Sequence, residues 1–158
     1  SAGGNLTAML CQQIPVEERP AYQVLCYPST DSSKNSASRE RWSKGYLLDL
    51  DLIDWFNARY CSGEDMADPR ISPLLAQTLD AQPPAMMITA GMDPLVDEGL
   101  AYADRLEANG VAVTRLHYAP LIHGFITLYG ALPVAEVAVA EMISAIGHQM
   151  HGLKVAPV

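Results

Sequence analysis

Three short stretches of this sequence contain residue types that could act together in nucleophilic catalysis. The chain opens with Ser1-Ala2-Gly3-Gly4, a serine in a turn of small residues. Asp93 follows an apolar run in GMDPLVDEG, and His123 stands in LIHGF. An imidazole can take the proton of a serine hydroxyl while a carboxylate orients the imidazole, so these three side chains are candidates for one site.

The turn at Ser1 matches the second half of the G-x-S-x-G nucleophile elbow, in which small residues allow a strained strand-to-helix turn to present a serine. The following helix would offer backbone N–H groups and its positive dipole end to a developing oxyanion, with the N–H of Ala2 as one donor. The alternative is an ordinary N-cap serine, which is the more common use of serine at a helix start.

Asp93 is expected at the carboxyl end of a buried strand, where ligands and catalytic groups gather in open α/β sheets. Pro94 favours an extended backbone at Asp93. A structural interpretation makes Asp93 the N-cap of the next helix, with Asp97 and Glu98 near the positive end of its dipole. Capping and catalysis are compatible, so both interpretations stay open.

A histidine in an apolar stretch is more often a core residue than a catalyst. His123, however, is expected in a loop directly after a strand and is followed by a glycine. His117, His148 and His151 lack such a setting and are predicted to be structural. The order Ser, Asp, His, with each residue at a strand end or a helix start, is less expected by chance than any one part.

Apolar periodicity predicts the elements that would position these residues. Two buried strands are expected over 23–28 and 85–91, and a third strand over 111–119. Helices are expected between Leu6 and Ile14, from Leu100 to Asn109-Gly110, and from Pro133 to about Met150. Because strands and helices alternate, the fold class is α/β, with a mostly parallel sheet and helices on both faces.

The segments between these elements have distinct compositions. Residues 29–41 are rich in Ser, Asp, Asn and Lys, which indicates an exposed, mobile loop that forms no core. Apolar residues return at helical spacing within 42–60, among acids, which indicates an amphipathic helix. Four prolines interrupt residues 68–84 and leave room for a turn or two of helix.

At least one edge of the predicted sheet lacks a neighbouring strand. Only three strands are expected, each buried on both faces, so the backbone groups at one edge have no partners. The pattern also begins with a helix that no strand precedes. We therefore expect residues 1–158 to be the C-terminal part of one domain, with a preceding half that supplies further strands. A helix leading an unusually small open sheet is the alternative.

Composition excludes several classes of protein. The chain of 158 residues is 49% hydrophobic and 18% charged, as expected of one globular domain. A net charge of −8 with ten Lys and Arg argues against a nucleic-acid partner, and no run is long enough for a membrane span. Cys11, Cys26 and Cys61 lack metal-ligand spacing and are expected to be reduced and mostly buried, as in a cytoplasmic protein.

Four stretches give the chain a family resemblance as far as Phe125: SAGGNL, DPRISPL, PPAMMITAGMDPLVDEGLAYADRLEANGV and HYAPLIHGF. On these motifs the sequence resembles the C-terminal half of an α/β-hydrolase of the hormone-sensitive-lipase-like esterase family. The resemblance implies that Ser1 is the nucleophile of a G-D-S-A-G-G elbow whose leading Gly-Asp lies outside this sequence. It also implies that His123 is the general base and that Asp93 orients it.

The same resemblance assigns Asp97 and Glu98 to the family's D-E pair, for which we expect only a supporting or packing role. The family's remaining oxyanion donors come from an H-G-G-G loop before the elbow, which this sequence does not contain. Residues 29–65 correspond to a loop and a helix of the cap over the pocket, whose apolar face would suit short or medium acyl chains. Plain packing of a surface helix explains that face equally well.

The resulting prediction is a serine carboxylesterase that acts on a small ester through an acyl-enzyme, with no metal and no cofactor. It would need the preceding half of the protein, and a homo-oligomer is compatible with it. Two other classes are considered: an N-terminal-nucleophile hydrolase in which the amine of Ser1 is the base, and a non-catalytic binding module on a hydrolase fold.

Overall fold

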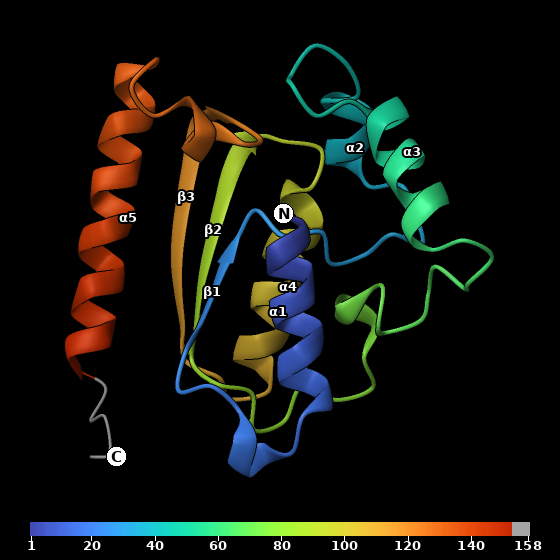
Figure 1. The fold of residues 1–158 in the computed structure, drawn as a ribbon, viewed down its shortest axis with the longest axis vertical. Coiled ribbons are helices and arrows are strands. Elements are labelled where there is room, and N and C mark those ends of the chain that lie inside the picture. Colours follow the sequence, from blue (N-terminus) through green and yellow to red (C-terminus); the bar gives the residue numbers. More distant parts are fainter. Residues whose placement is uncertain (153–158) are drawn as a thin grey trace. The chain divides into compact units, whose positions relative to one another are not determined.

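The structure is a computed structural model that describes residues 1–152 and divides into two compact units, Ser1–Gly124 and Phe125–Val158. Figure 1 shows the elements. The first unit contains, in order, α1 (Ala2–Gln13), β1 (Gln23–Cys26), α2 (Ala37–Arg41), α3 (Leu50–Tyr60), β2 (Ala85–Met92), α4 (Val96–Ala108) and β3 (Val113–Ile122). Short 3-10 turns occupy Val16–Glu18 and Pro73–Leu75.

The second unit is described by itself. It consists of a 3-10 turn at Phe125–Leu128 and the long helix α5 (Pro133–Gly152). Pro133 stands at the first position of α5, where its fixed φ and missing N–H suit a helix start. The predicted last helix is therefore confirmed. None of the helices formed by residues 1–152 combines the length and apolar character that crossing a bilayer requires.

The three strands form one parallel sheet in the order β1-β2-β3, as the alternating pattern predicted. The central strand β2 is buried from Ala85 to Ala90, which explains its continuous apolar sequence. Within the described part of the chain, β1 and β3 each pair only with β2. The outer edges of β1 and β3 are therefore unpaired there, as the sequence led us to expect.

Helices α1 and α4 cover the same face of the sheet (Figure 1). Both helices share a buried apolar cluster with the strands. Its members include Ala8 of α1, Tyr102, Ala103 and Leu106 of α4, and Leu25, Ala85 and Met87 of the strands. The buried hydroxyl of Tyr102 accepts a hydrogen bond from Gln12 of α1 at 3.1 Å, which satisfies a polar atom within this cluster. This packing fixes the start of α1 relative to the sheet.

The ladder between β2 and β3 changes register near its end. Ala90 pairs with Tyr118, an offset of 28 residues, whereas Met92 pairs with Ile122, an offset of 30. The strand β3 therefore contributes two more residues than β2 across this irregularity, and one of them is Pro120, which cannot donate to a ladder. Opposite it lies Gly91, where an added Cβ would meet the carbonyl oxygen of Ala119 at 2.5 Å. Only glycine permits this approach.

The segment after β1 corrects the prediction from composition. Residues 29–41 were expected to be an exposed loop, but they contain the short helix α2, and Thr30, Asp31, Ser38 and Arg39 are buried. These polar side chains are buried because other polar groups meet them, as described below for Asp97 and Glu98. Composition could not show this, because the partners lie far away in the sequence.

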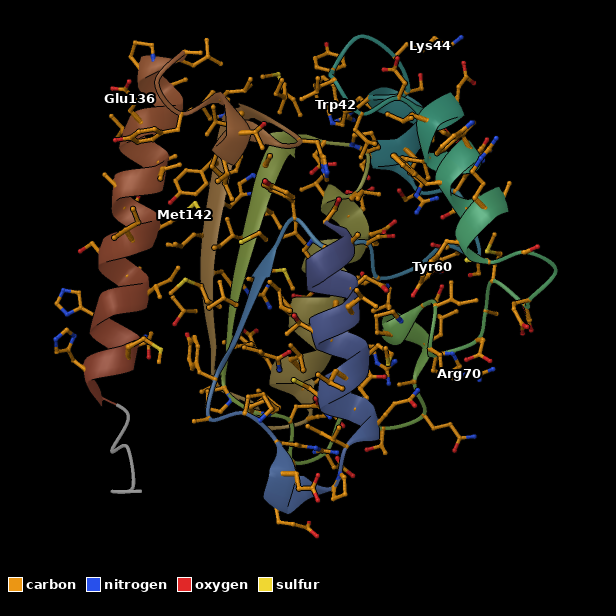
Figure 2. All side chains as sticks on the ribbon, in the orientation of Figure 1. Trp42, Lys44, Tyr60, Arg70, Glu136 and Met142 are labelled. Atoms are coloured by element: carbon orange, nitrogen blue, oxygen red, sulfur yellow. The ribbon has the colours of Figure 1, made fainter. Side chains whose placement is uncertain are left out.

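The expected amphipathic helix within 42–60 is present as α3, which begins only at Leu50, after the N-cap position at Asp49. Figure 2 shows Trp42 before α3 and Tyr60 at its end. Ile53 is the buried residue of α3, whereas Leu52, Trp55, Phe56 and Tyr60 are exposed. Most of the apolar surface of α3 is thus not covered by residues 1–152.

Candidate active site

The carboxylate of Asp93 and the imidazole of His123 form a buried hydrogen-bonded pair. The Nδ1 atom of His123 lies 2.7 Å from Oδ2 of Asp93, and both residues are buried. An ionised carboxylate can only accept, so in a pair of carboxylate and neutral imidazole the proton lies on Nδ1 and Nε2 keeps its lone pair. This tautomer is the one in which a histidine can act as a general base.

The irregular ladder explains why these two residues meet. Asp93 directly follows Met92, and His123 directly follows Ile122, the residue paired with Met92. Had the earlier offset of 28 continued, Leu121 would stand beside Asp93 instead. The two extra residues of β3 therefore bring the imidazole, and not an apolar side chain, to the carboxylate.

The turn after β2 holds the carboxylate in place. Oδ1 of Asp93 accepts a hydrogen bond from the backbone N–H of Leu95 at 2.8 Å, so each carboxylate oxygen has a different partner. The N-cap position of α4 is Leu95, with no side-chain cap. The interpretation of Asp93 as the N-cap of α4 is therefore wrong, although its side chain does stabilise the turn that leads into the helix.

Ser1 occupies the N-cap position of α1, but its hydroxyl makes no capping hydrogen bond to the helix. Of the two interpretations of Ser1, the structural one explains its position and not its hydroxyl. The first turn of α1 carries no acidic side chain, so its positive end is not neutralised there. In a chain that begins at Ser1, burial lowers the pKa of its α-amino group, an effect that the charges of Cys26 and Asp93 oppose.

The residues after β1 approach the start of α1 closely. An added Cβ at Gly4 would lie 2.9 Å from Cβ of Pro28, whereas Gly3 has open space. Gly4, which the general G-x-S-x-G pattern does not specify but the longer G-D-S-A-G-G elbow includes, is thus the glycine that this packing requires. Tyr27, which directly precedes Pro28, has a positive φ of 35°. Its ring packs against that of His123 with the two centroids 4.6 Å apart. Such backbone strain often accompanies functional sites.

Tyr27 contributes to the site as a neutral ring. Burial, followed by the charges of Cys26 and Asp93, raises the pKa of Tyr27 to about 12. The phenol therefore stays protonated throughout the neutral range, and the aromatic ring against His123 excludes water from one side of the imidazole.

A cavity of about 500 Å³ opens beside Ser1 and Ala2 within the first unit. Most of its wall is apolar, and much of that wall comes from α3 and the segments that flank it. The apolar lining residues are Leu6, Leu48, Ile53, Phe56, Tyr60, Ile71 and Leu95. A pocket of this size and character accommodates a small apolar group next to the Ser1 hydroxyl.

The carboxylates of Asp97 and Glu98 bind the segment after β1. The Glu98 carboxylate accepts hydrogen bonds from the N–H of Thr30 at 2.8 Å and from the Arg39 guanidinium at 3.0 and 2.8 Å. Asp97 accepts from the N–H of Ser38 at 2.8 Å. Burial raises the pKa of the Glu98 carboxyl, an effect that the charge of Arg39 opposes.

Ser38 and Arg39 were not predicted to belong to the site, because a Ser- and Lys-rich stretch is usually solvated.

Of the histidines predicted to be structural, His117 pairs with Thr89 at 2.9 Å and His151 contacts the carbonyl of Gly147. Cys11, Cys26 and Cys61 are free thiols, as predicted. Within residues 1–152, no group of three or more His, Cys, Asp or Glu side chains is arranged to hold a metal ion.

The fold is that of the α/β hydrolases. A family model described as the alpha/beta hydrolase fold matches residues 1–127, and the chain belongs to this family. The resemblance to hormone-sensitive-lipase-like esterases is confirmed by its relatives. The chain is 41% identical to a carboxylic ester hydrolase, LipN, of Mycobacterium tuberculosis, over 92% of this chain and 41% of that protein.

A second relative is the ethyl acetate hydrolase of Pseudomonas putida, which is 35% identical over 92% of this chain and 47% of its own length. Among solved structures, an esterase of Pyrobaculum calidifontis superposes with a TM-score of 0.86 at 36% identity, over 95% of this chain and 50% of that one. An ester hydrolase from the metagenome of Lake Arreo gives 0.79 at 42% identity, over 93% and 49%. The chain spans about half the length of the relatives it matches.

Proposed function

We propose that the full-length protein is a serine carboxylesterase with Ser1 as nucleophile, His123 as general base and Asp93 as the residue that orients the base. The observation that carries this proposal is the buried hydrogen bond between Nδ1 of His123 and Oδ2 of Asp93, because it leaves Nε2 free to accept a proton. The esterase names of the relatives support the reaction class.

In this mechanism the Ser1 hydroxyl oxygen attacks the ester carbonyl while Nε2 of His123 takes its proton. The tetrahedral intermediate collapses, the C–O bond to the alcohol breaks, and the imidazolium gives its proton to the leaving alcohol. Water then attacks the acyl-enzyme by the same route and releases the acid. The N–H of Ala2, at the exposed start of α1, would stabilise the oxyanion in both steps.

The complete site, we propose further, includes residues outside these 158. One backbone donor is less than an oxyanion hole usually provides, and each donor is worth about 3 kcal/mol in the transition state. The unpaired edge of β1 and the exposed side chains of Leu6 and Leu10 on α1 would be covered by such residues. Relatives of about twice the length are consistent with this arrangement.

The substrate would be an ester with a short or medium acyl chain. This part of the proposal depends on the mostly apolar cavity of about 500 Å³ beside Ser1, which has the size and character to accept a small aliphatic group. Among the relatives, one is named for ethyl acetate.

Covalent labelling tests the nucleophile directly. We expect a fluorophosphonate to label the full-length protein on Ser1 and to stop hydrolysis of p-nitrophenyl butyrate, and the Lake Arreo ester hydrolase was itself solved with a bipyridine phosphonate derivative. The substitutions Ser1→Ala and His123→Ala should abolish turnover, while Asp93→Asn should lower kcat by up to roughly 10⁴-fold. His117→Ala, which removes a histidine that pairs with Thr89, is the matched control.

Two experiments separate the other two classes of function. A non-catalytic binding module would not be labelled at Ser1. In a chain that begins at Ser1, the lowered pKa of the α-amino group favours its neutral form, as an N-terminal-nucleophile hydrolase requires. Acetylation of that amine would stop such an enzyme, but it would leave His123 able to accept the Ser1 proton, so the esterase mechanism would persist.

A further inference from the structure

The turn that carries Asp93 is held from outside by Ser38, a residue of α2. The Ser38 hydroxyl donates to the carbonyl oxygen of Pro94 at 2.7 Å and accepts from the backbone N–H of Asp97 at 3.3 Å. In return, the carboxylate of Asp97 accepts the N–H of Ser38 at 2.8 Å. Three hydrogen bonds thus join one residue of α2 to the five-residue turn that begins at Asp93.

The direction of these hydrogen bonds follows from counting protons. A serine hydroxyl has one proton, and that of Ser38 goes to Pro94. The contact of 3.0 Å between Oγ of Ser36 and Oγ of Ser38 must therefore have Ser36 as donor. Oγ of Ser36 in turn accepts from the N–H of Arg39 at 3.3 Å. A chain of donors therefore runs from Arg39 through Ser36 and Ser38 to the carbonyl that adjoins Asp93.

A buried ion pair fixes α2 behind this chain. Arg39 and Glu98 are both buried, and Arg39 also donates to the carbonyl oxygen of Asp31 at 2.9 Å. Glu98 lies in the first turn of α4, directly after Asp97. Because the ion pair and the Ser38 contacts bind the same two segments, the distance between α2 and the Asp93 turn is fixed at two adjacent points.

We propose that Ser38 is a positioning residue for the proposed esterase reaction: its hydroxyl, held between Pro94 and Asp97, sets the orientation of the Asp93 carboxylate toward His123. The inference rests on the proposed function for its kinetic consequence. Pro94 adjoins Asp93 in the chain, and the N–H of Leu95, the next residue, binds Oδ1 of Asp93. A displacement of the Pro94 carbonyl, which Ser38 holds, therefore moves both the backbone of Asp93 and the N–H that binds its carboxylate.

The test compares Ser38→Ala with wild type in the full-length protein, by kinetics and by the low-field ¹H NMR resonance of the His123 Nδ1 proton after ¹⁵N-histidine labelling. We expect the resonance to shift or broaden in Ser38→Ala. We also expect kcat for p-nitrophenyl butyrate to fall about 10- to 100-fold while KM stays within about twofold, because misplacement of a catalytic group affects the transition state. Ser38→Thr, which keeps the hydroxyl, should restore both.

The matched control is Ser72→Ala. Ser72 is also a buried serine whose hydroxyl joins two backbone segments, since it donates to the carbonyl oxygen of Met66 at 2.6 Å and accepts from the N–H of Ser32 at 2.8 Å. Both of these segments are distinct from the Asp93 turn. We expect Ser72→Ala to leave the resonance and kcat close to wild type, whatever it does to stability.

Asp97→Ala removes the acceptor of the Ser38 N–H at an exposed side chain, so it tests the same contact with little risk to folding. It should shift the resonance in the direction that Ser38→Ala does, by less. The proposal is overturned if Ser38→Ala and Asp97→Ala both keep the wild-type resonance and kcat. Failure of the proposed function would appear separately, as an absence of fluorophosphonate labelling at Ser1 in the wild-type protein.

Discussion

In two neighbouring segments of the first unit, burial is the reverse of what composition predicts. The polar stretch after β1 is buried, with Ser38 and Arg39 only 4% and 3% exposed, whereas Trp55 and Phe56 of the apolar helix α3 are 48% and 52% exposed. The polar segment is buried because the Glu98 carboxylate meets the Arg39 guanidinium, and the Pro94 carbonyl and the Asp97 N–H meet the Ser38 hydroxyl. On α3, the exposed rings of Phe56 and Tyr60 line a cavity and do not fill a core.

The contrast shows that the hydropathy of a side chain predicts its burial only where the side chain meets water or other apolar side chains, and not where it meets a polar group. For Ser38 and Arg39 the partners are Asp97 and Glu98, which are 59 residues away in the sequence. Variants that remove a polar partner should therefore be far more destabilising than variants that remove an apolar side chain from α3.

The largest effect is expected from Glu98→Ala. This substitution leaves the buried guanidinium of Arg39 without its carboxylate, and loss of one partner of a buried ion pair costs about 3–5 kcal/mol. Urea unfolding of the full-length protein measures the loss in the free energy of unfolding. A loss below about 1 kcal/mol, as for a surface pair, would contradict the structural role given to this contact.

The double variant Arg39→Met with Glu98→Leu serves as the control for this result. It replaces both charges with apolar side chains of similar length, and such replacements are often neutral or stabilising. We expect it to be more stable than Glu98→Ala. A double variant that is no more stable would show that the backbone N–H groups of Thr30 and Asp31, which also bind Glu98, cause most of the loss.

An intermediate effect, on selectivity and not on stability, is expected from Phe56→Ala. The ring of Phe56 is half exposed and lines the cavity beside Ser1, so its removal should cost much less than the 3–5 kcal/mol of a buried phenylalanine. The ratio of kcat/KM for p-nitrophenyl hexanoate to that for the acetate should fall roughly tenfold, because the longer chain loses apolar contact.

Leu52→Ala is the matched control for α3. Leu52 lies one turn before Phe56 and is 40% exposed, but it does not line the cavity. The ratio of the two kcat/KM values should be unchanged in this variant. An equal fall in both variants would mean that α3 acts through its general position and not through contact between Phe56 and the acyl chain.

The smallest effect is expected at the exposed pair of Asp68 and Arg70. Hydrogen bonds from the Arg70 side chain and backbone lower the pKa of Asp68 to about 2. Since this pKa is depressed in the folded protein, the contribution of the pair is present above the ordinary carboxyl pKa and is lost as the pH falls toward about 2. In Arg70→Gln, an NMR titration of the Asp68 carboxyl should give a pKa closer to its ordinary value.

Stability should barely respond to Arg70→Gln, because exposed ion pairs contribute little. The midpoint of urea unfolding at neutral pH should equal that of wild type within error. A clear decrease would show that Asp68 and Arg70 form part of a larger network, and it would weaken the contrast with the buried pair of Arg39 and Glu98.

The sequence was sufficient to predict the parallel sheet, the order of its elements and the pairing of Asp93 with His123. Continuous apolar runs define buried strands, and both residues stand in short motifs at strand ends, so the signal is local. The position of Ser38 and the burial of Arg39 were not predictable, because they depend on contacts with α4. The function of Gly4 also became clear only from its contact with Pro28.

The shift of two residues between β2 and β3 has a consequence for protein engineering. Asp93 and His123 lie opposite each other only because β3 is two residues longer than β2 across the irregularity at Gly91, where no side chain fits. A graft of these loops onto another parallel sheet would therefore fail to pair the two side chains if it copied Asp93 and His123 alone. The grafted segments must also include Gly91 of β2 and the two extra residues of β3, which produce the change of register.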